Sequence, residues 1–103
     1  MPYIPPEHER PFLDPAVTVM AQRLAEHTAD METADCGGRL NYVITTLIIK
    51  YIKFRWGKLK YSIGDVVSGV LINVYSEFYE RAMRPYEDRK IEENGDVGYE
   101  DIL

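Results

Sequence analysis

Apolar residues recur every three or four positions in the first third of the chain, the spacing of one helix face. Asp14 can accept hydrogen bonds from the free N–H groups of a helix start, and Pro15 suits the first turn because its missing N–H has no partner there. These signals predict a helix over residues 15–29. The apolar positions of its face are Leu13, Val17, Met20, Ala21 and Leu24.

The stretch from residue 40 to residue 56 is rich in β-branched residues, which favour strands, yet its pattern is helical. A strand of this length without a turn signal would be unusual, and at about 100° per residue the polar side chains gather on one narrow arc. A strand would place them on both faces, so we predict a helix over residues 39–56. The polar arc consists of Arg39, Thr46, Lys50 and Lys53.

A third helix is predicted over residues 62–84. Ser62 and Asp65 resemble a capping box, and apolar residues then follow at helical spacing on two stripes. Pro85 cannot donate a backbone hydrogen bond and disfavours helix at the residue before it, so we expect the helix to end or kink there. A short fourth helix then restarts and ends at Gly95. One stripe contains Ile63, Val66, Val67, Val70, Val74 and Phe78, and the other contains Gly64, Ser68, Leu71, Tyr75, Tyr79 and Ala82.

Together these elements predict an all-α fold, a small helical bundle of three main helices and a short C-terminal helix, as one domain over residues 1–103. Residues 1–13 are rich in proline and are expected to form an extended arm. Residues 96–103 are expected to form an acidic tail. Because both ends also carry apolar side chains, we expect the arm and the tail to dock on the helices.

The composition fits one small soluble domain, since 46% of the 103 residues are hydrophobic and 28% are charged. A single cysteine, Cys36, cannot form an internal disulfide. The longest uncharged apolar-rich run, residues 40–49, is too short to span a membrane. We therefore expect a cytoplasmic protein without a membrane-spanning segment, and nothing in the composition indicates a cofactor.

Charge is distributed in blocks along the chain. Residues 39–61 hold six bases and no acid, whereas residues 1–38 and residues 85–103 each carry a net charge of −5. The end of the basic block alternates bases with aromatic residues, as a surface that binds phosphates and stacks on nucleobases does. The alternative is a solvated basic face or one paired with the chain's own acids, and the overall net charge of −5 favours that alternative. The candidate nucleic-acid surface consists of Lys50, Lys53, Arg55, Trp56, Lys58 and Lys60.

Two apolar surfaces exceed what one small core needs. One is a patch on the helix predicted over residues 39–56, apart from its main apolar face. The other is the stripe of the third helix that opens with small residues, which let another helix approach closely. The residues of the two surfaces are Tyr42, Ile49, Trp56, Gly64, Ser68, Tyr75 and Tyr79. They predict a homo-oligomer, and we expect a non-enzymatic interaction or assembly domain.

Residues suited to catalysis lack the neighbours they would need. His8 lies in the Pro-rich arm and His27 near the end of the first predicted helix, and the chain has no nucleophile motif. A zinc site built from His27 and Cys36 would lack paired ligand spacing. We therefore assign no catalytic and no metal-binding residue.

One carboxylate pattern supplies an enzymatic alternative. Glu77-x-x-Glu80 and Glu93-x-x-Asp96 are similar to the paired motifs of the all-α nucleoside triphosphate pyrophosphohydrolases. In that family four carboxylates hold magnesium against a polyphosphate. There the second pair lies inside a helix that another long helix follows, whereas here the turn signal Asn94-Gly95 splits the second pair. This alternative requires the four carboxylates to converge.

Several segments carry a likeness that spans most of the chain. They are Tyr3-Ile4-Pro5-Pro6, Phe12-Leu13-Asp14-Pro15, Leu40-Asn41-Tyr42-Val43, Glu77-Phe78-Tyr79-Glu80-Arg81 and the run from Arg84 to Val97. In these segments the chain resembles a family of short uncharacterised prokaryotic and phage proteins. The resemblance implies a small domain of unknown function, a prokaryotic or viral source and a cytoplasmic setting. It supplies no catalytic or binding residues.

Overall fold

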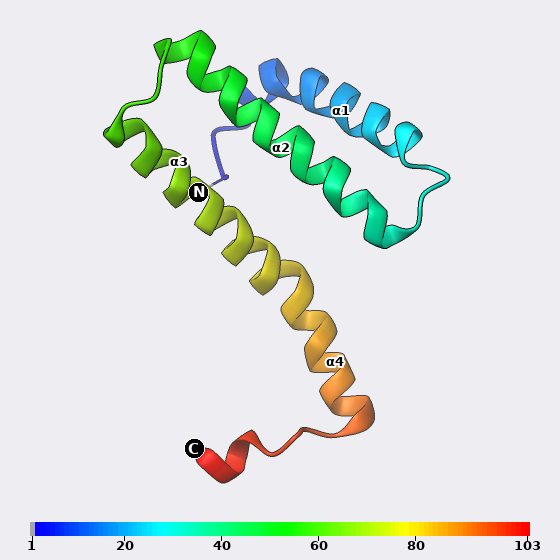
Figure 1. The fold of residues 1–103 in the computed structure, drawn as a ribbon. Coiled ribbons are helices and arrows are strands. Elements are labelled where there is room, and N and C mark those ends of the chain that lie inside the picture. The colour runs from blue at the N-terminus through cyan, green and yellow to red at the C-terminus, as the bar shows by residue number, and fades with distance from the viewer. Residues whose placement is uncertain (1) are drawn as a thin grey trace. The chain divides into compact units, whose positions relative to one another are not determined.

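The computed structural model describes residues 2–103, and this part of the chain is helical and contains no strand. The prediction of an all-α fold is confirmed. The chain divides into two units, Pro2–Val67 and Ser68–Leu103, which are described separately. In chain order the elements are α1 (Glu9–His27), α2 (Thr33–Trp56), α3 (Tyr61–Phe78), the π-helix η1 (Tyr79–Met83), α4 (Arg84–Asn94) and the 3₁₀-helix η2 (Tyr99–Ile102) (Figure 1).

Helix α1 begins at Glu9, six residues before the predicted start, so the prediction of an extended arm over residues 1–13 is wrong for residues 9–13. Pro11 is compatible with this start because the first four N–H groups of any helix lack an intrahelical partner. Pro15 lies inside the helix instead of opening it. Residues 2–5 have no regular structure, and the Nε–H of Arg10 donates to the Ile4 carbonyl at 2.8 Å.

Helix α2 begins at Thr33, also six residues before the predicted start, and the connection from α1 shortens to residues 28–32. Gly37 and Gly38 suggested a loop because glycine is a poor helix former, yet both lie within α2. The helix ends as predicted, at Gly57, whose φ of 83° closes it. The β-branched stretch is helical, so the arc of polar side chains was the better guide to its structure.

In the unit Pro2–Val67, α1 and α2 lie side by side and antiparallel (Figure 1). Open grooves flank their line of contact, and residues near the end of α1 face residues near the start of α2 across each groove. Ile63, at the start of α3, is 7% exposed and is the single described residue that is buried. Helices α1 and α2 therefore pair, but neither helix contains a buried residue.

In the unit Ser68–Leu103, a π-turn joins two α-helices. The predicted helix over residues 62–84 ends as an α-helix at Phe78, and α4 starts at Arg84 with Pro85 in its first turn. The Arg84 N–H bonds to the Tyr79 carbonyl, five residues back. This wider turn accommodates the proline, whose ring and missing N–H would disrupt a regular α-helix.

Helix α4 ends where the sequence predicted, since Gly95 follows it with a φ of 83°. Within the predicted acidic tail, residues Tyr99–Ile102 form η2, which follows Gly98 with its φ of 100°. Among residues 2–103, no helix is both long enough and apolar enough to cross a membrane.

Candidate functional site

Exposed apolar surface is the dominant feature of the described residues. Thirty large hydrophobic residues are exposed, and they occur in both units. Single exposed hydrophobic residues are ordinary, but exposed apolar side chains in this number require an explanation.

The predicted patch on α2 lies at the surface. Tyr42 is 69% exposed, Ile49 is 60% exposed, and Trp56 is also exposed. These residues are seven positions apart, close to two helical turns, so they share one face of α2. The edge of the Trp56 ring meets Tyr51, with 5.2 Å between the ring centroids and 66° between their planes. The three residues therefore lie along one face of α2, and the last of them belongs to an aromatic pair.

Part of the predicted stripe along α3 and η1 contacts other residues of the same chain. A Cβ added at Gly64 would lie 3.6 Å from Leu59 Cδ1, so the chain's own side chain occupies that space. Tyr75 is exposed and stacks on Tyr79, with ring centroids 6.3 Å apart. Ser68 is exposed on the same helix.

Tyr79 is fixed in place by a carboxylate. Its hydroxyl donates to Glu87 Oε2 at 2.7 Å. This hydrogen bond, followed by partial burial and the negative charge of Glu87, raises the pKa of Tyr79 above its ordinary value. Tyr79 therefore orients α4 against η1, a role the sequence did not indicate.

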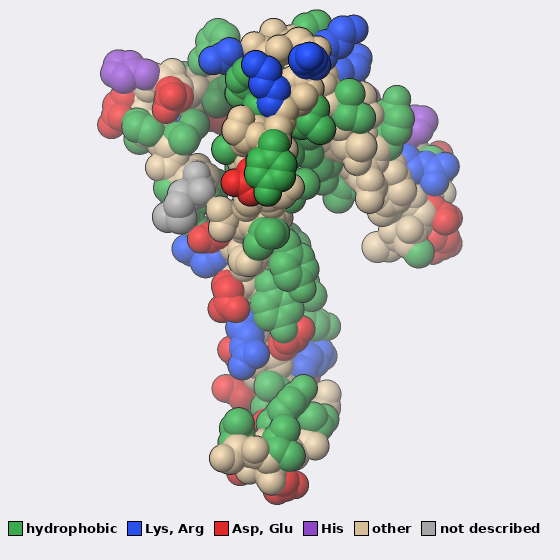
Figure 2. Space-filling model, turned by 60° about the vertical axis from the view of Figure 1, so that its left-hand side comes forward, with side chains coloured by type: hydrophobic (Ala, Val, Ile, Leu, Met, Phe, Trp, Pro, Cys, Tyr) green, Lys and Arg blue, Asp and Glu red, His purple; other side chains and the backbone are tan. Residues whose placement is uncertain are grey.

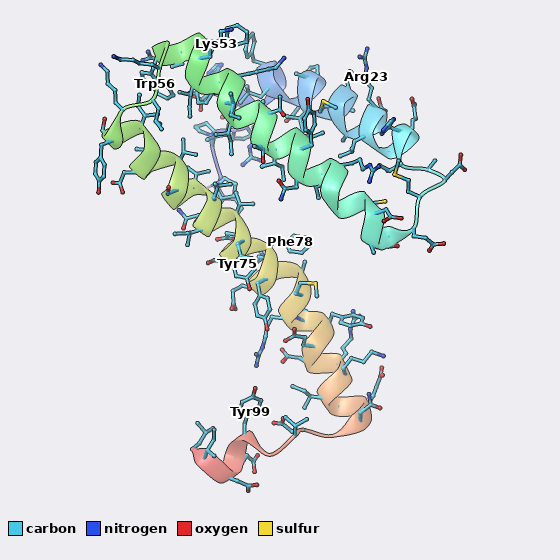
Figure 3. The ribbon with its side chains drawn as sticks, in the orientation of Figure 1. Arg23, Lys53, Trp56, Tyr75, Phe78 and Tyr99 are labelled. Carbon is cyan, nitrogen blue, oxygen red and sulfur yellow. The ribbon has the colours of Figure 1, made fainter. Side chains whose placement is uncertain are left out.

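Helix α3 is apolar around most of its circumference. At about 100° per residue, its exposed apolar side chains cover about 240° of the helix. These side chains are Val66, Val70, Leu71, Ile72, Val74, Tyr75 and Phe78 (Tyr75 and Phe78 are labelled in Figure 3). A helix that is apolar on so many sides is typical of the interior of a bundle.

The predicted basic residues gather at one end of the unit Pro2–Val67. Lys50, Lys53, Arg55, Lys58 and Lys60 are all exposed, and we call these five the basic cluster. Figure 2 shows Lys and Arg side chains together at the top of the view, and Figure 3 places Lys53 and Trp56 at the C-terminal end of α2. Within the unit Pro2–Val67, none of the five forms an ion pair with a carboxylate of that unit. Pairing with the acids between residues 2 and 38 therefore finds no support.

Aromatic side chains lie among these bases. Phe54 is 81% exposed and Tyr61 is 91% exposed. The Arg55 guanidinium lies over the Trp56 ring, 5.2 Å from its centroid. Bases and exposed rings thus occupy the same end of α2.

An open groove between α1 and α2 was not predicted. It has a volume of about 720 Å³, and Met20, Leu24, Tyr42 and Val43 supply its apolar walls. Arg23, His27, Gly38 and Arg39 complete the lining, and Arg39 also donates to the Asp35 carbonyl at 3.2 Å. The groove depends on how two helices pair, so no local sequence signal marks it.

The carboxylates of the enzymatic alternative do not form a site. Among the described residues there is no group of three or more His, Cys, Asp or Glu side chains that could hold a metal ion. Glu93 pairs instead with Lys90 at 3.1 Å, and Asp96 accepts from the neighbouring Val97 N–H at 2.7 Å. The convergence required of Glu77, Glu80, Glu93 and Asp96 is therefore not observed.

Fold and surface together define a small all-α protein with exposed apolar helix faces and one acid-free basic end. The chain belongs to a family described as a domain of unknown function, DUF6899, whose match covers residues 1–97. The resemblance to an uncharacterised family is thereby confirmed. Comparisons with curated proteins and with solved structures give no match.

Proposed function

We propose that this protein is a non-enzymatic assembly domain that associates with further copies of itself. The observation that carries the proposal is that Ile63 is the single buried residue among those described. Burial of apolar surface is the main force that stabilises a fold, and this chain leaves most of that surface in water.

The amount of exposed surface suits a large homo-oligomeric interface. Obligate dimers bury about 2,000–5,000 Å² in total, or about 1,000–2,500 Å² from each partner. Thirty large hydrophobic residues are exposed on one chain, and an interface of this size could cover many of them. A second copy supplies helices with the same apolar faces, and a two-fold axis pairs each face with its own equivalent.

Helices α2 and α3 are the surfaces we expect the second copy to cover. The α2 patch of Tyr42, Ile49 and Trp56 is a strip of the width that one helix covers. The apolar circumference of α3 is too wide for one neighbouring helix, so it requires neighbours on several sides. Two chains that pack together provide these neighbours.

Sedimentation velocity of the full chain tests the proposal. Between about 1 and 100 μM, we expect a mass of at least twice 11.9 kDa, with dissociation at the lowest concentrations if the affinity is micromolar. A compact monomer at every concentration would mean that the chain covers its own apolar faces, and it would refute the proposal.

A further inference from the structure

We infer that the basic end of α2, together with the loop that follows it, binds single-stranded nucleic acid through its phosphates and stacks exposed rings on the bases. The site consists of the basic cluster and the aromatic residues Phe54 and Tyr61. This inference goes beyond self-association, because neither ring belongs to the α2 patch of Tyr42, Ile49 and Trp56.

The cations of this site are available to an external anion. All five residues of the basic cluster are exposed, and none forms an ion pair with a carboxylate of its own unit, Pro2–Val67. By contrast, Arg84 and Lys90 in α4 pair with Asp88 and Glu93 at 3.2 and 3.1 Å. Affinity for nucleic acid depends on how many cations replace condensed counterions, so unpaired cations are the effective ones.

Rings beside these cations favour single strands over duplexes. Phe54 and Tyr61 expose most of their surface next to lysines, and Arg55 already lies over Trp56. Surfaces that bind single strands combine a basic track with aromatic rings on which unpaired bases stack. In a duplex the bases are stacked on one another and their faces are not accessible.

The chain's own acidic segment is the competing occupant. Residues 85–103 carry a net charge of −5, so the same segment of a second copy could neutralise the basic cluster. Four of the seven carboxylates in this segment are already engaged by nearby groups, which weakens this competitor. The engaged carboxylates are Glu87 with Tyr79, Asp88 with Arg84, Glu93 with Lys90 and Asp96 with the Val97 N–H.

Fluorescence anisotropy with a labelled oligothymidylate of about 20 nucleotides tests the inference. If all five cations contact phosphates, log K falls with log salt at a slope of about −3.5, so the affinity drops about 100-fold between 50 and 200 mM salt. In the triple variant Lys53→Gln, Arg55→Gln, Lys58→Gln the slope should be about −1.4 and the drop about 7-fold. Far-UV circular dichroism checks that the triple variant is folded. If it is not, the single variant Lys53→Gln replaces it, and the slope should then change by about 0.7.

A matched control separates the site from net charge. The triple variant Arg84→Gln, Arg89→Gln, Lys90→Gln removes the same three charges from α4 and should keep the wild-type slope. Trp56 is the one tryptophan of the chain and its ring lies against Arg55, so a change in its fluorescence on binding reports contact at this end of α2.

Inorganic polyphosphate distinguishes phosphate binding from base stacking. Phe54→Leu and Tyr61→Leu should each weaken oligothymidylate binding about tenfold and leave polyphosphate binding unchanged. The inference would be overturned if the triple variant of the basic cluster and the triple variant of α4 lost equal affinity for oligothymidylate. Equal affinity of the wild type for polyphosphate and oligothymidylate would also overturn it. So would an absence of binding at about 50 mM salt. If the Lys53, Arg55, Lys58 triple then also loses self-association, the acidic segment of a second copy is the occupant.

Discussion

Truncation of Ile49 to alanine separates assembly from the stability of the single chain. Ile49 is 60% exposed and lies in the middle of the α2 patch. Alanine lacks three of its carbon atoms, and burial of each contributes about 0.8 kcal/mol. If a partner covers the exposed 60%, the loss is about 1.4 kcal/mol per copy, or about 3 kcal/mol in a symmetric dimer that uses the residue twice. The dimer dissociation constant should therefore rise about 100-fold.

In an isolated helix, by contrast, Ile49→Ala should not lower helix stability. Alanine has a higher helix propensity than isoleucine by a few tenths of a kcal/mol, so in a monomer with Ile49 in water the substitution leaves stability unchanged or raises it slightly. A loss of association with no loss of helicity can then arise only from contact with another chain.

Sedimentation equilibrium of wild type and Ile49→Ala measures the change in the dissociation constant. Leu47→Ala is the matched control, because it also truncates an exposed apolar residue of α2, 65% exposed, but lies on the opposite side of the helix from Ile49. We expect the control to remain within about threefold of wild type. An Ile49→Ala dissociation constant that also stays within about threefold would refute the assignment of this face.

Three further outcomes follow from the structure. Pro85→Ala should convert the π-turn Tyr79–Met83 into regular α-helix, because the missing N–H is restored, and unchanged backbone chemical shifts over these residues would contradict this. The raised pKa of Tyr79 means that its bond to Glu87 stabilises the fold fully below the ordinary tyrosine pKa of about 10 and is lost as pH rises through the folded pKa. Glu87→Gln should therefore lower the pKa of Tyr79 in a tyrosinate absorbance titration, with Tyr79→Phe to assign the signal. Deletion of residues 97–103 should lower the melting temperature or shift the oligomeric state, and an unchanged protein would show that the tail is free.

Element type was predictable from the sequence because helical periodicity is a property of local spacing. The β-branched stretch of α2 is the clearest example, since its side chains suit a strand while its polar residues fall on one helical arc. Element starts were not predictable in the same way. Proline and glycine are both poor helix formers, so Pro11 and Gly38 argued against these starts. Pro11, however, lies in the first turn of α1, where a backbone N–H has no intrahelical partner. Gly38 lies inside α2, where one glycine lowers helix stability less than an interruption of the helix would.

Surface features, too, could be predicted only where they follow from local spacing in the sequence. The basic cluster lies on consecutive turns of one helix and the loop after it, so it was visible as a run of residues. The bond between Tyr79 and Glu87 was not, because it joins residues eight apart. In a regular α-helix, residues seven positions apart lie on the same face. The π-turn inserts one extra residue, so here residues eight positions apart lie on the same face. Such a pair can be recognised only once the π-turn is known.

In the proposed assembly, folding and association of this chain are linked but separable equilibria. Isolated helices of ordinary length are marginal in water, and most helical stability in proteins comes from packing an apolar face. Here α1 lies beside α2, and the apolar side chains of α3 are largely exposed. Under the proposed function, a second chain supplies the surfaces that further stabilise these helices. Under this reasoning the Ile49 side chain contributes to the helical fold only through the partner that covers it, so its truncation acts on assembly first and on helicity only after the chains separate.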